Sequence, residues 1–185
     1  AYFTSPAVQA ALDNFWKNAP APDGAGLQDH LAACWKELVR RMAHNPAVIG
    51  YDLMNEPFPG TAALPSQMML FARGAEVMAE IDPAHPLTAE ELAMQWLNPA
   101  GRTQLLARLE DKTLFASIID VTQPVYAEFE RSQLLPFFQR AADAIREVDP
   151  ARILLIETSM GSNMGVRSAV EPLRGMYGQV DPAQA

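Results

Sequence analysis

The sequence contains little cysteine, few basic residues and no long apolar run. Its single cysteine, Cys34, excludes an intrachain disulfide. Lys and Arg number 14 against 22 Asp and Glu, and the formal charge of −8 excludes the cationic surface that binds nucleic acid. Apolar runs such as residues 153–156 are far shorter than the roughly 20 residues that a membrane span needs. The sequence shows no basic segment followed by an apolar stretch, so no signal peptide is visible and export is left open.

The remaining composition is that of one folded domain. Hydrophobic residues make up 49% and charged residues 19% of the 185 residues. A helix is expected over residues 6–16, and two units of helix, short loop and strand follow it. The first unit is a helix over 27–42 with a strand over 48–54, and the second is a helix over 134–148 with a strand over 153–156. Strands separated by helices predict parallel strands with right-handed crossovers, and therefore an α/β fold.

Cys34 lies on the apolar stripe of the helix expected over 27–42. The stripe has the three-and-four spacing of an amphipathic helix and consists of Leu27, Leu31, Cys34, Trp35, Leu38 and Met42. Since free cysteine is among the most buried residue types, the stripe predicts that Cys34 is a buried structural thiol rather than a nucleophile.

The stretch from Thr61 to Arg131 is too long for an ordinary connection between a strand and its helix. Apolar spacing predicts one helix over 68–78, the capping box Thr88 to Glu91 predicts the start of another, and residues 105–119 offer a third. We interpret residues 61–131 as a helical insertion. Helical spacing favours a core role for its methionines and aromatics, and the alternative is a lid or a lipid-facing wall.

Glu56 directly follows the first expected strand. Pro57 has no N–H to donate, so the strand ends there and the Glu56 carboxylate is placed at its carboxyl end. In parallel barrels this end is the catalytic face, where a carboxyl group can act as a general acid. The alternative is a simple turn with a helix-capping carboxylate.

The segment around Glu56 resembles a known family. Residues 45–60, NPAVIGYDLMNEPFPG, are similar to the fourth-strand segment of glycoside hydrolase family 5, and most similar to its endoglycoceramidase-like members. The helix before this strand and residues 134–157 extend the likeness. The resemblance implies a partial (β/α)8 TIM barrel in which Glu56 is the acid/base of a retaining mechanism and Asn55 holds the 2-hydroxyl of the sugar.

Retention needs a second carboxylate about 5–5.5 Å away as nucleophile. In the family that Glu ends the seventh strand, whereas residues 153–157 correspond to the fifth. The chain is therefore expected to be an incomplete catalytic domain without the nucleophile. Glu157 ends the fifth strand on the same face and is predicted either to contact substrate or to tie down the following loop, with Arg167 as a candidate partner.

No cofactor is implied, and no metal site is expected. His30, His44 and His85 lack metal-ligand spacing, and the loop from Gly161 to Gly165 lacks the lysine of a phosphate loop.

Three functions remain open. The first is a retaining β-glycosidase that hydrolyses O-glycosidic bonds in a β-linked glycan or glycolipid. If the resemblance holds, this enzyme would be secreted. The present chain alone is expected to be inactive. The second is a non-catalytic half-barrel that serves as a binding or assembly module and self-associates or binds the missing half. The third is a different α/β enzyme that happens to contain Asn-Glu-Pro. Within the first, endoglycoceramidase-like likeness favours glycolipids, and the wider family includes cellulases and mannanases.

Overall fold

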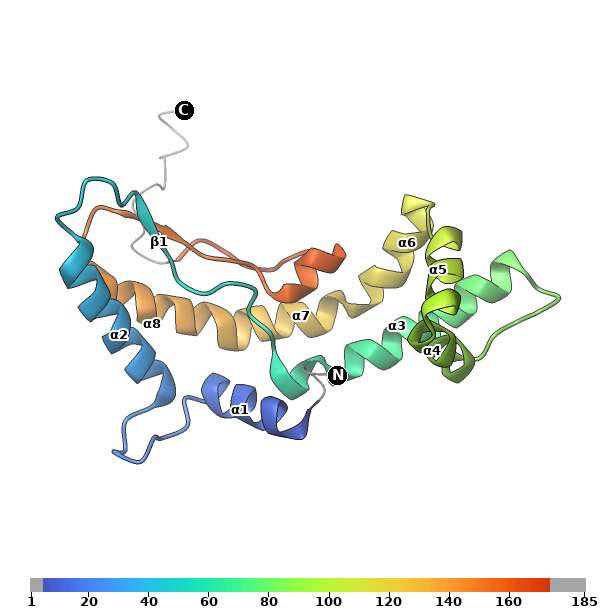
Figure 1. Ribbon diagram of the computed structural model, residues 1–185, viewed down its shortest axis with the longest axis horizontal. Helices are drawn as coiled ribbons and strands as arrows, with labels where there is room; N and C mark the ends of the chain where they lie inside the picture. The colour runs from blue at the N-terminus through green and yellow to red at the C-terminus, as the bar shows by residue number, and fades with distance from the viewer. Residues whose placement is uncertain (1–4, 174–185) are drawn as a thin grey trace.

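The computed structural model describes residues 5–173 and shows a helix-rich, elongated molecule (Figure 1). Two short parallel strands and the helices α1, α2 and α8 occupy one end, and helices α3 to α6 occupy the other. The helices are α1 (Pro6–Trp16), α2 (Leu27–Met42), α3 (Leu64–Ile81), α4 (Ala89–Leu97), α5 (Pro99–Arg108), α6 (Lys112–Ile119), α7 (Gln123–Phe129) and α8 (Leu135–Arg146), and the strands are β1 (Gly50–Asp52) and β2 (Ile153–Leu155).

The two strands pair in parallel, as the repeated helix–loop–strand pattern predicts. Gly50 is opposite Ile153 and Asp52 is opposite Leu155. Both strands are shorter than expected, although the Leu53 N–H still donates to the carbonyl of Leu155 over 3.1 Å. The described chain is therefore an α/β piece with two adjacent strands and not a closed sheet.

Among residues 5–173, side chains cover one face of this small sheet and leave the other open. Tyr51 and Leu154 are buried against the helices, whereas Ile153 and Leu155 on the opposite face are 59% and 51% exposed. Side chains alternate between the two faces of a strand, so these four residues define a packed face and an open apolar face. Large sheets with parallel strands are normally covered on both faces.

The principal core lies between the sheet and the helices α1, α2 and α8. Phe137 and Phe138 are fully buried, and Trp16 packs edge-to-face on Phe129 with ring centroids 4.8 Å apart. Helix α2 packs on α8 through Ala32 and Val39. This core fixes the strands against the helices that precede them in the chain.

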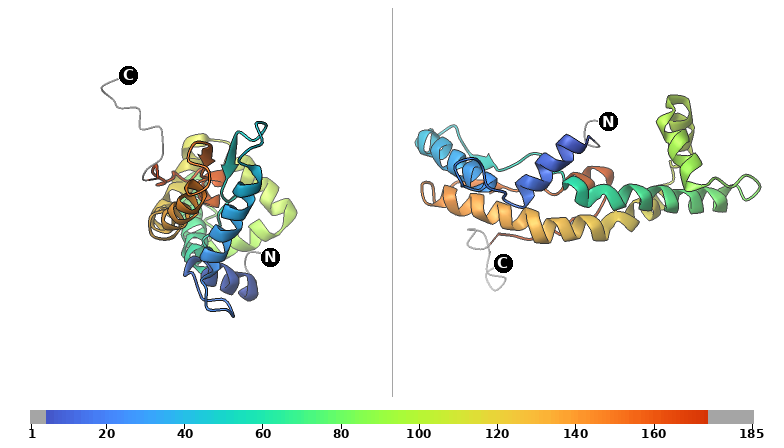
Figure 2. Two further views of the ribbon diagram at one scale, coloured as in Figure 1. Left: turned by 90° about the vertical axis from the view of Figure 1, so that its left-hand side faces the viewer. Right: turned by 90° about the horizontal axis from the view of Figure 1, so that it is seen from below.

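A long helix runs through most of the molecule (Figure 2). Helix α7, a π-helical turn over Glu130–Leu134 and helix α8 follow one another without interruption. The helix expected over 134–148 is thus only the last part of a much longer one. Its apolar stripe continues backwards from Phe138 through Leu134 to Tyr126, all of them buried.

Helices α3 to α6 form a separate cluster with its own small core of Val77, Met78, Leu92, Leu105 and Ile118. The predicted capping box is confirmed. The Glu91 N–H donates to the Thr88 hydroxyl oxygen over 3.2 Å, and the Thr88 N–H donates to the Glu91 carboxylate over 2.8 Å. The single helix expected over 105–119 is instead two, because Asp111 caps the N-terminus of α6 and accepts from the Thr113 and Leu114 N–H groups. Within residues 5–173, no helix combines the length and apolar character that crossing a membrane requires.

The prediction that Cys34 is buried is wrong. Cys34 is exposed, because the buried side of α2 is the row Gln28, Ala32 and Val39, one position away from the apolar stripe. Leu38 is also 42% exposed. Leu31 and Trp35 of the predicted stripe are half-buried and still pack against the core, whereas Cys34 and Leu38 face solvent.

Candidate active site

The backbone turns sharply where β1 ends. Asn55 and Glu56 form a bend, and Glu56 has φ of 47°, in the left-handed region that non-glycine residues rarely adopt. Pro57 follows and is buried. Such a conformation costs on the order of 1 kcal/mol and persists only when neighbouring groups hold it. Backbone strain of this kind is concentrated at functional sites, which makes Glu56 a candidate on structural grounds alone.

Glu157 is the group that holds the Glu56 backbone. It follows β2, and its Oε2 accepts the Glu56 N–H over 2.8 Å. The N–H of Met160 donates to the Pro57 carbonyl over 3.0 Å and joins the same two loops a second time. The loops after two neighbouring parallel strands thus form one unit at the carboxyl edge of the sheet.

The Glu56 side chain is exposed and has one polar partner among the described residues. The side-chain amide of Asn163, in the loop after β2, donates to Glu56 Oε1 over 2.8 Å. Asn55 is exposed beside it. The carboxylate therefore faces solvent with one oxygen occupied, which leaves it accessible to a substrate oxygen.

The predicted residues fall into two groups. Asn55, Glu56 and Glu157 come together at the strand ends. Arg167 does not pair with Glu157: it is exposed, and within residues 5–173 no ion pair joins the two side chains. The predicted pairing of Arg167 with Glu157 is wrong, because the Glu157 carboxylate accepts from the Glu56 N–H instead.

Glu130 is the residue that sequence reasoning missed. It begins the π-helical turn, has no exposed surface, and binds the loop after β2 through both carboxylate oxygens. Oε1 accepts from the Ser159 N–H (2.9 Å) and hydroxyl (2.7 Å), and Oε2 accepts from the Ser168 hydroxyl (3.0 Å) and the Ala169 N–H. The sequence does contain a signal for it. Tyr126, Leu134 and Phe138 are apolar residues at spacings of four or eight, and Glu130 is an acidic residue in the same row.

The most strongly perturbed carboxyl group lies at the opposite edge of the sheet. Burial raises the pKa of Asp149, but hydrogen bonds from the Arg152 side chain, from the Arg152 and Ala151 N–H groups and from the Tyr51 hydroxyl outweigh it and lower that pKa from 3.8 to about 2. Burial and the hydrogen bond to Asp149 raise the pKa of Tyr51. In parallel barrels the amino edge of the strands serves stability, and this cluster fits that role.

Arg152 completes the cluster by joining β2 to the end of α2. Its guanidinium donates to the Val48 carbonyl (2.7 Å) and the Asn45 carbonyl (2.9 Å), and to the carboxylate of Asp149 (2.7 Å). The cluster therefore fixes the start of both strands, at the edge away from Glu56.

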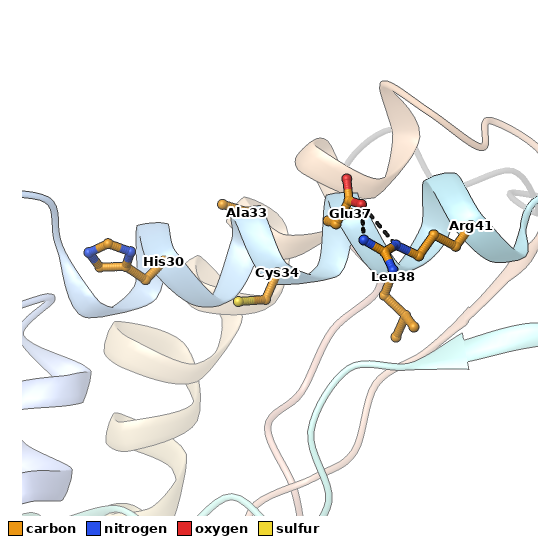
Figure 3. A pocket seen from close by; sticks show the side chains of 6 residues that line it. All are labelled: His30, Ala33, Cys34, Glu37, Leu38 and Arg41. Atoms are coloured by element: carbon orange, nitrogen blue, oxygen red, sulfur yellow. Dashed lines mark hydrogen bonds and ion pairs between the residues drawn. The ribbon is translucent and has the colours of Figure 1, made fainter.

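One shallow hollow in the described surface has no residue of the Glu56 loop in its lining. It lies along the outer side of α2 and is lined by His30, Ala33, Cys34, Glu37, Leu38 and Arg41 (Figure 3). The Arg41 side chain donates to Glu37 within it, over 2.8 Å. This hollow therefore does not supply the walls that a sugar site at Glu56 needs.

In the part of the chain that the structure describes, no group of three His, Cys, Asp or Glu side chains could hold a metal ion.

Comparison with known proteins finds similar segments in three endoglycoceramidases. The endoglycoceramidase I of Rhodococcus hoagii is 35% identical over 63 residues, which are 34% of this chain and 12% of that protein. The endoglycoceramidases of Cyanea nozakii and Hydra vulgaris are 39% and 42% identical over 59 residues, or 32% of this chain and 11% and 10% of theirs. The matched segments are thus a small part of each relative's length. No solved structure matches.

The family comparison covers far more of the sequence. The family model described as cellulase (glycosyl hydrolase family 5) matches residues 11–180, which is most of the chain. The chain belongs to glycosyl hydrolase family 5.

Proposed function

We propose that this chain is part of a retaining β-glycosidase with Glu56 as its acid/base. The observation that carries the proposal is the exposed Glu56 carboxylate at the carboxyl end of β1, on a strained backbone that Glu157 holds from the neighbouring strand. Membership of the family supports the reaction class, the hydrolysis of glycosidic bonds. β1 and β2 then correspond to the fourth and fifth strands of a (β/α)8 barrel.

In this mechanism Glu56 protonates the leaving glycosidic oxygen and then removes a proton from the attacking water. Both steps need one carboxyl oxygen open to substrate, which agrees with the exposed side chain and its single bound oxygen. Asn55, exposed beside Glu56, would hold the 2-hydroxyl of the sugar.

The nucleophile would come from a strand beyond these two. A retaining pair has its carboxyl groups about 5–5.5 Å apart, with both side chains free to meet the sugar. Glu157 has one oxygen committed to the Glu56 N–H, so its role in the proposal is to hold the acid/base and not to attack the sugar. The open apolar face of the sheet, with Ile153 and Leu155, is where the remaining strands would pack.

Glycolipids are the substrate class that we propose within the family. The named relatives are endoglycoceramidases, and the cluster of α3 to α6 follows directly after the Glu56 loop. Met68 and Leu97 on this cluster are 65% and 72% exposed, and such side chains suit a wall against which a lipid tail can lie.

Hydrolysis of an alkyl β-glucoside, whose leaving group needs a proton to depart, tests the proposal. The 185-residue chain alone should give no turnover, whereas a barrel completed by the remaining strands of its gene product should hydrolyse the substrate and release the β-anomer first. Glu56→Gln should then lower kcat/KM by about 10²- to 10⁴-fold, the usual contribution of general acid–base catalysis. The matched control is Glu147→Gln, which changes an exposed glutamate paired with Lys36. Release of the α-anomer first, or full activity after Glu56→Gln, would overturn it.

A non-catalytic assembly module is the second candidate, and the open sheet face favours it. Ile153 and Leu155 on this face are 59% and 51% exposed. Contiguous exposed apolar surface marks an interaction site in soluble proteins. Light scattering on the chain separates the readings: a stable dimer that Ile153→Lys dissociates supports assembly, and a strict monomer argues against it.

A further inference from the structure

The loop after β2 is fastened at two points to a single buried carboxylate. Glu130 accepts hydrogen bonds from Ser159 at the start of the loop and from Ser168 and Ala169 at its end. These four bonds use both oxygens of a side chain that has no contact with solvent. Glu130 therefore determines where the segment 159–169 begins and ends relative to the long helix.

The middle of this loop is seated on α7 by shape. Gly161 lies against the ring of Tyr126 so closely that an added Cβ would be 2.7 Å from it. Gly165 has φ of 94°, which glycine adopts without strain, and it ends the short helical turn 160–164. The loop path is thus fixed between its two attachments, and Asn163 projects from it.

Asn163 makes the one contact by which this loop reaches the Glu56 carboxylate. It is an exposed side chain that donates to Oε1 over 2.8 Å. A single exposed hydrogen bond contributes little and cannot hold a loop by itself. The position of Asn163 therefore comes from the anchored ends of the loop, together with the Met160 N–H to Pro57 carbonyl hydrogen bond and the seat of Gly161 on Tyr126.

We propose that Glu130 is a positioning residue that sets Asn163 against Glu56, and that Asn163 thereby selects which Glu56 oxygen carries the catalytic proton. An oxygen that accepts the Asn163 N–H acts as an acceptor, so the proton of the neutral carboxyl group resides on the other oxygen, Oε2. Asn163 keeps that proton directed away from the loop, where a glycosidic oxygen can receive it. This assignment rests on the proposed role of Glu56.

The π-helical turn supplies a reason why a carboxylate lies there. A π-turn inserts one residue into a helix, and such turns occur frequently at functional sites. Glu130 is the first residue of this turn and lies on the row of buried residues Tyr126 and Leu134. The helix thus directs the Glu130 carboxyl group inward against the loop after β2.

NMR of the 185-residue chain tests the linkage without requiring turnover. In the wild type, the Asn163 side-chain amide should lie downfield of a free asparagine amide and show cross-peaks to the Glu56 side chain. Glu130→Gln should move it to the free position and abolish those cross-peaks, while the amides of Tyr51 and Leu154 stay unchanged. Glu128→Gln, an exposed glutamate two residues earlier on α7, is the matched control and should change nothing.

Two further variants guard against misfolding of Glu130→Gln. Ser159→Ala and Ser168→Ala each remove one hydroxyl donor and keep the buried carboxylate, and each should move the Asn163 signal part of the way. An Asn163 amide that is already free in the wild type, or one that stays in place after Glu130→Gln, would overturn the proposal.

Kinetics of the completed barrel separate this inference from the proposed function. Asn163→Ala should lower kcat about tenfold and leave KM unchanged, because the contact is to the acid/base and not to the sugar. Asn163→Ser, a shorter donor, should restore part of the loss. If the completed barrel does not hydrolyse the substrate but the expected NMR changes are seen, the glycosidase role is refuted, and the positioning of Asn163 by Glu130 is still supported. Hydrolysis unaffected by Asn163→Ala would refute the role of Asn163 alone.

Discussion

Asp149 offers the sharpest test of what stabilises the sheet. Its carboxylate is 5% exposed and accepts from the Tyr51 hydroxyl over 3.0 Å and from Arg152 over 2.7 Å. The pKa of Asp149 falls from 3.8 to about 2 on folding. Each pKa unit corresponds to about 1.4 kcal/mol, and partial screening by solvent reduces the total to about 2 kcal/mol of stability.

The sign of the pH dependence follows from the lowered pKa. The unfolded chain protonates Asp149 near pH 4 and the folded chain near pH 2, so the stabilisation is complete above pH 4 and disappears as the pH falls to about 2. Asp149→Asn removes this titration and leaves the shape of the side chain almost unchanged. The variant should be about 2 kcal/mol less stable than the wild type at pH 6, and nearly equal to it at pH 2.

Urea unfolding between pH 2 and pH 7, followed by circular dichroism, measures both curves. The difference between them isolates Asp149 from the other carboxylates, which titrate in both proteins. Asp143→Asn is the control, because Asp143 is exposed on α8 and its carboxylate accepts a hydrogen bond from the Gln139 side chain. A stability difference that stays constant from pH 6 to pH 2 would refute the reasoning.

Two further substitutions test the packing. Gly161→Ala should cost about 1–3 kcal/mol in chemical denaturation, because the new Cβ would lie 2.7 Å from the Tyr126 ring; a neutral effect would mean that the loop is not seated on α7. Phe138→Ala should cost about 3–5 kcal/mol in the same assay, since Phe138 is fully buried in the core under the sheet. A loss below about 1 kcal/mol would show that this core is loosely packed.

The sequence was most informative where periodicity and turn chemistry agree. The pattern of apolar residues with a proline after Glu56 identified β1 and the carboxylate at its end, and the capping box at Thr88 located the start of α4. The parallel pairing with β2 followed from the helix between the strands. These features are local, so short segments of sequence suffice to predict them.

The failures concern contacts between distant segments. Cys34 was expected inside because it lies on the apolar stripe of α2, but the buried residues of α2 are those of the neighbouring row, Gln28, Ala32 and Val39. The role of Glu130 depends on Ser159 and Ser168, which are about thirty or more positions away in the chain. Arg167, in the loop that follows, was the candidate partner for Glu157, yet the Glu56 N–H takes that place. Periodicity shows that a face is apolar, and it does not say which element will cover it.

The dependence of hydrolysis on the leaving group tests the central claim most directly. If Glu56 is the acid/base, the completed barrel with Glu56→Gln should lose about 10²- to 10⁴-fold in the rate of sugar transfer from a substrate whose leaving group needs a proton, such as an alkyl β-glucoside. The same variant should retain nearly the wild-type rate of the first step with 2,4-dinitrophenyl β-glucoside, whose leaving group departs without protonation. Equal losses with both substrates would contradict the assignment of Glu56 as the acid/base.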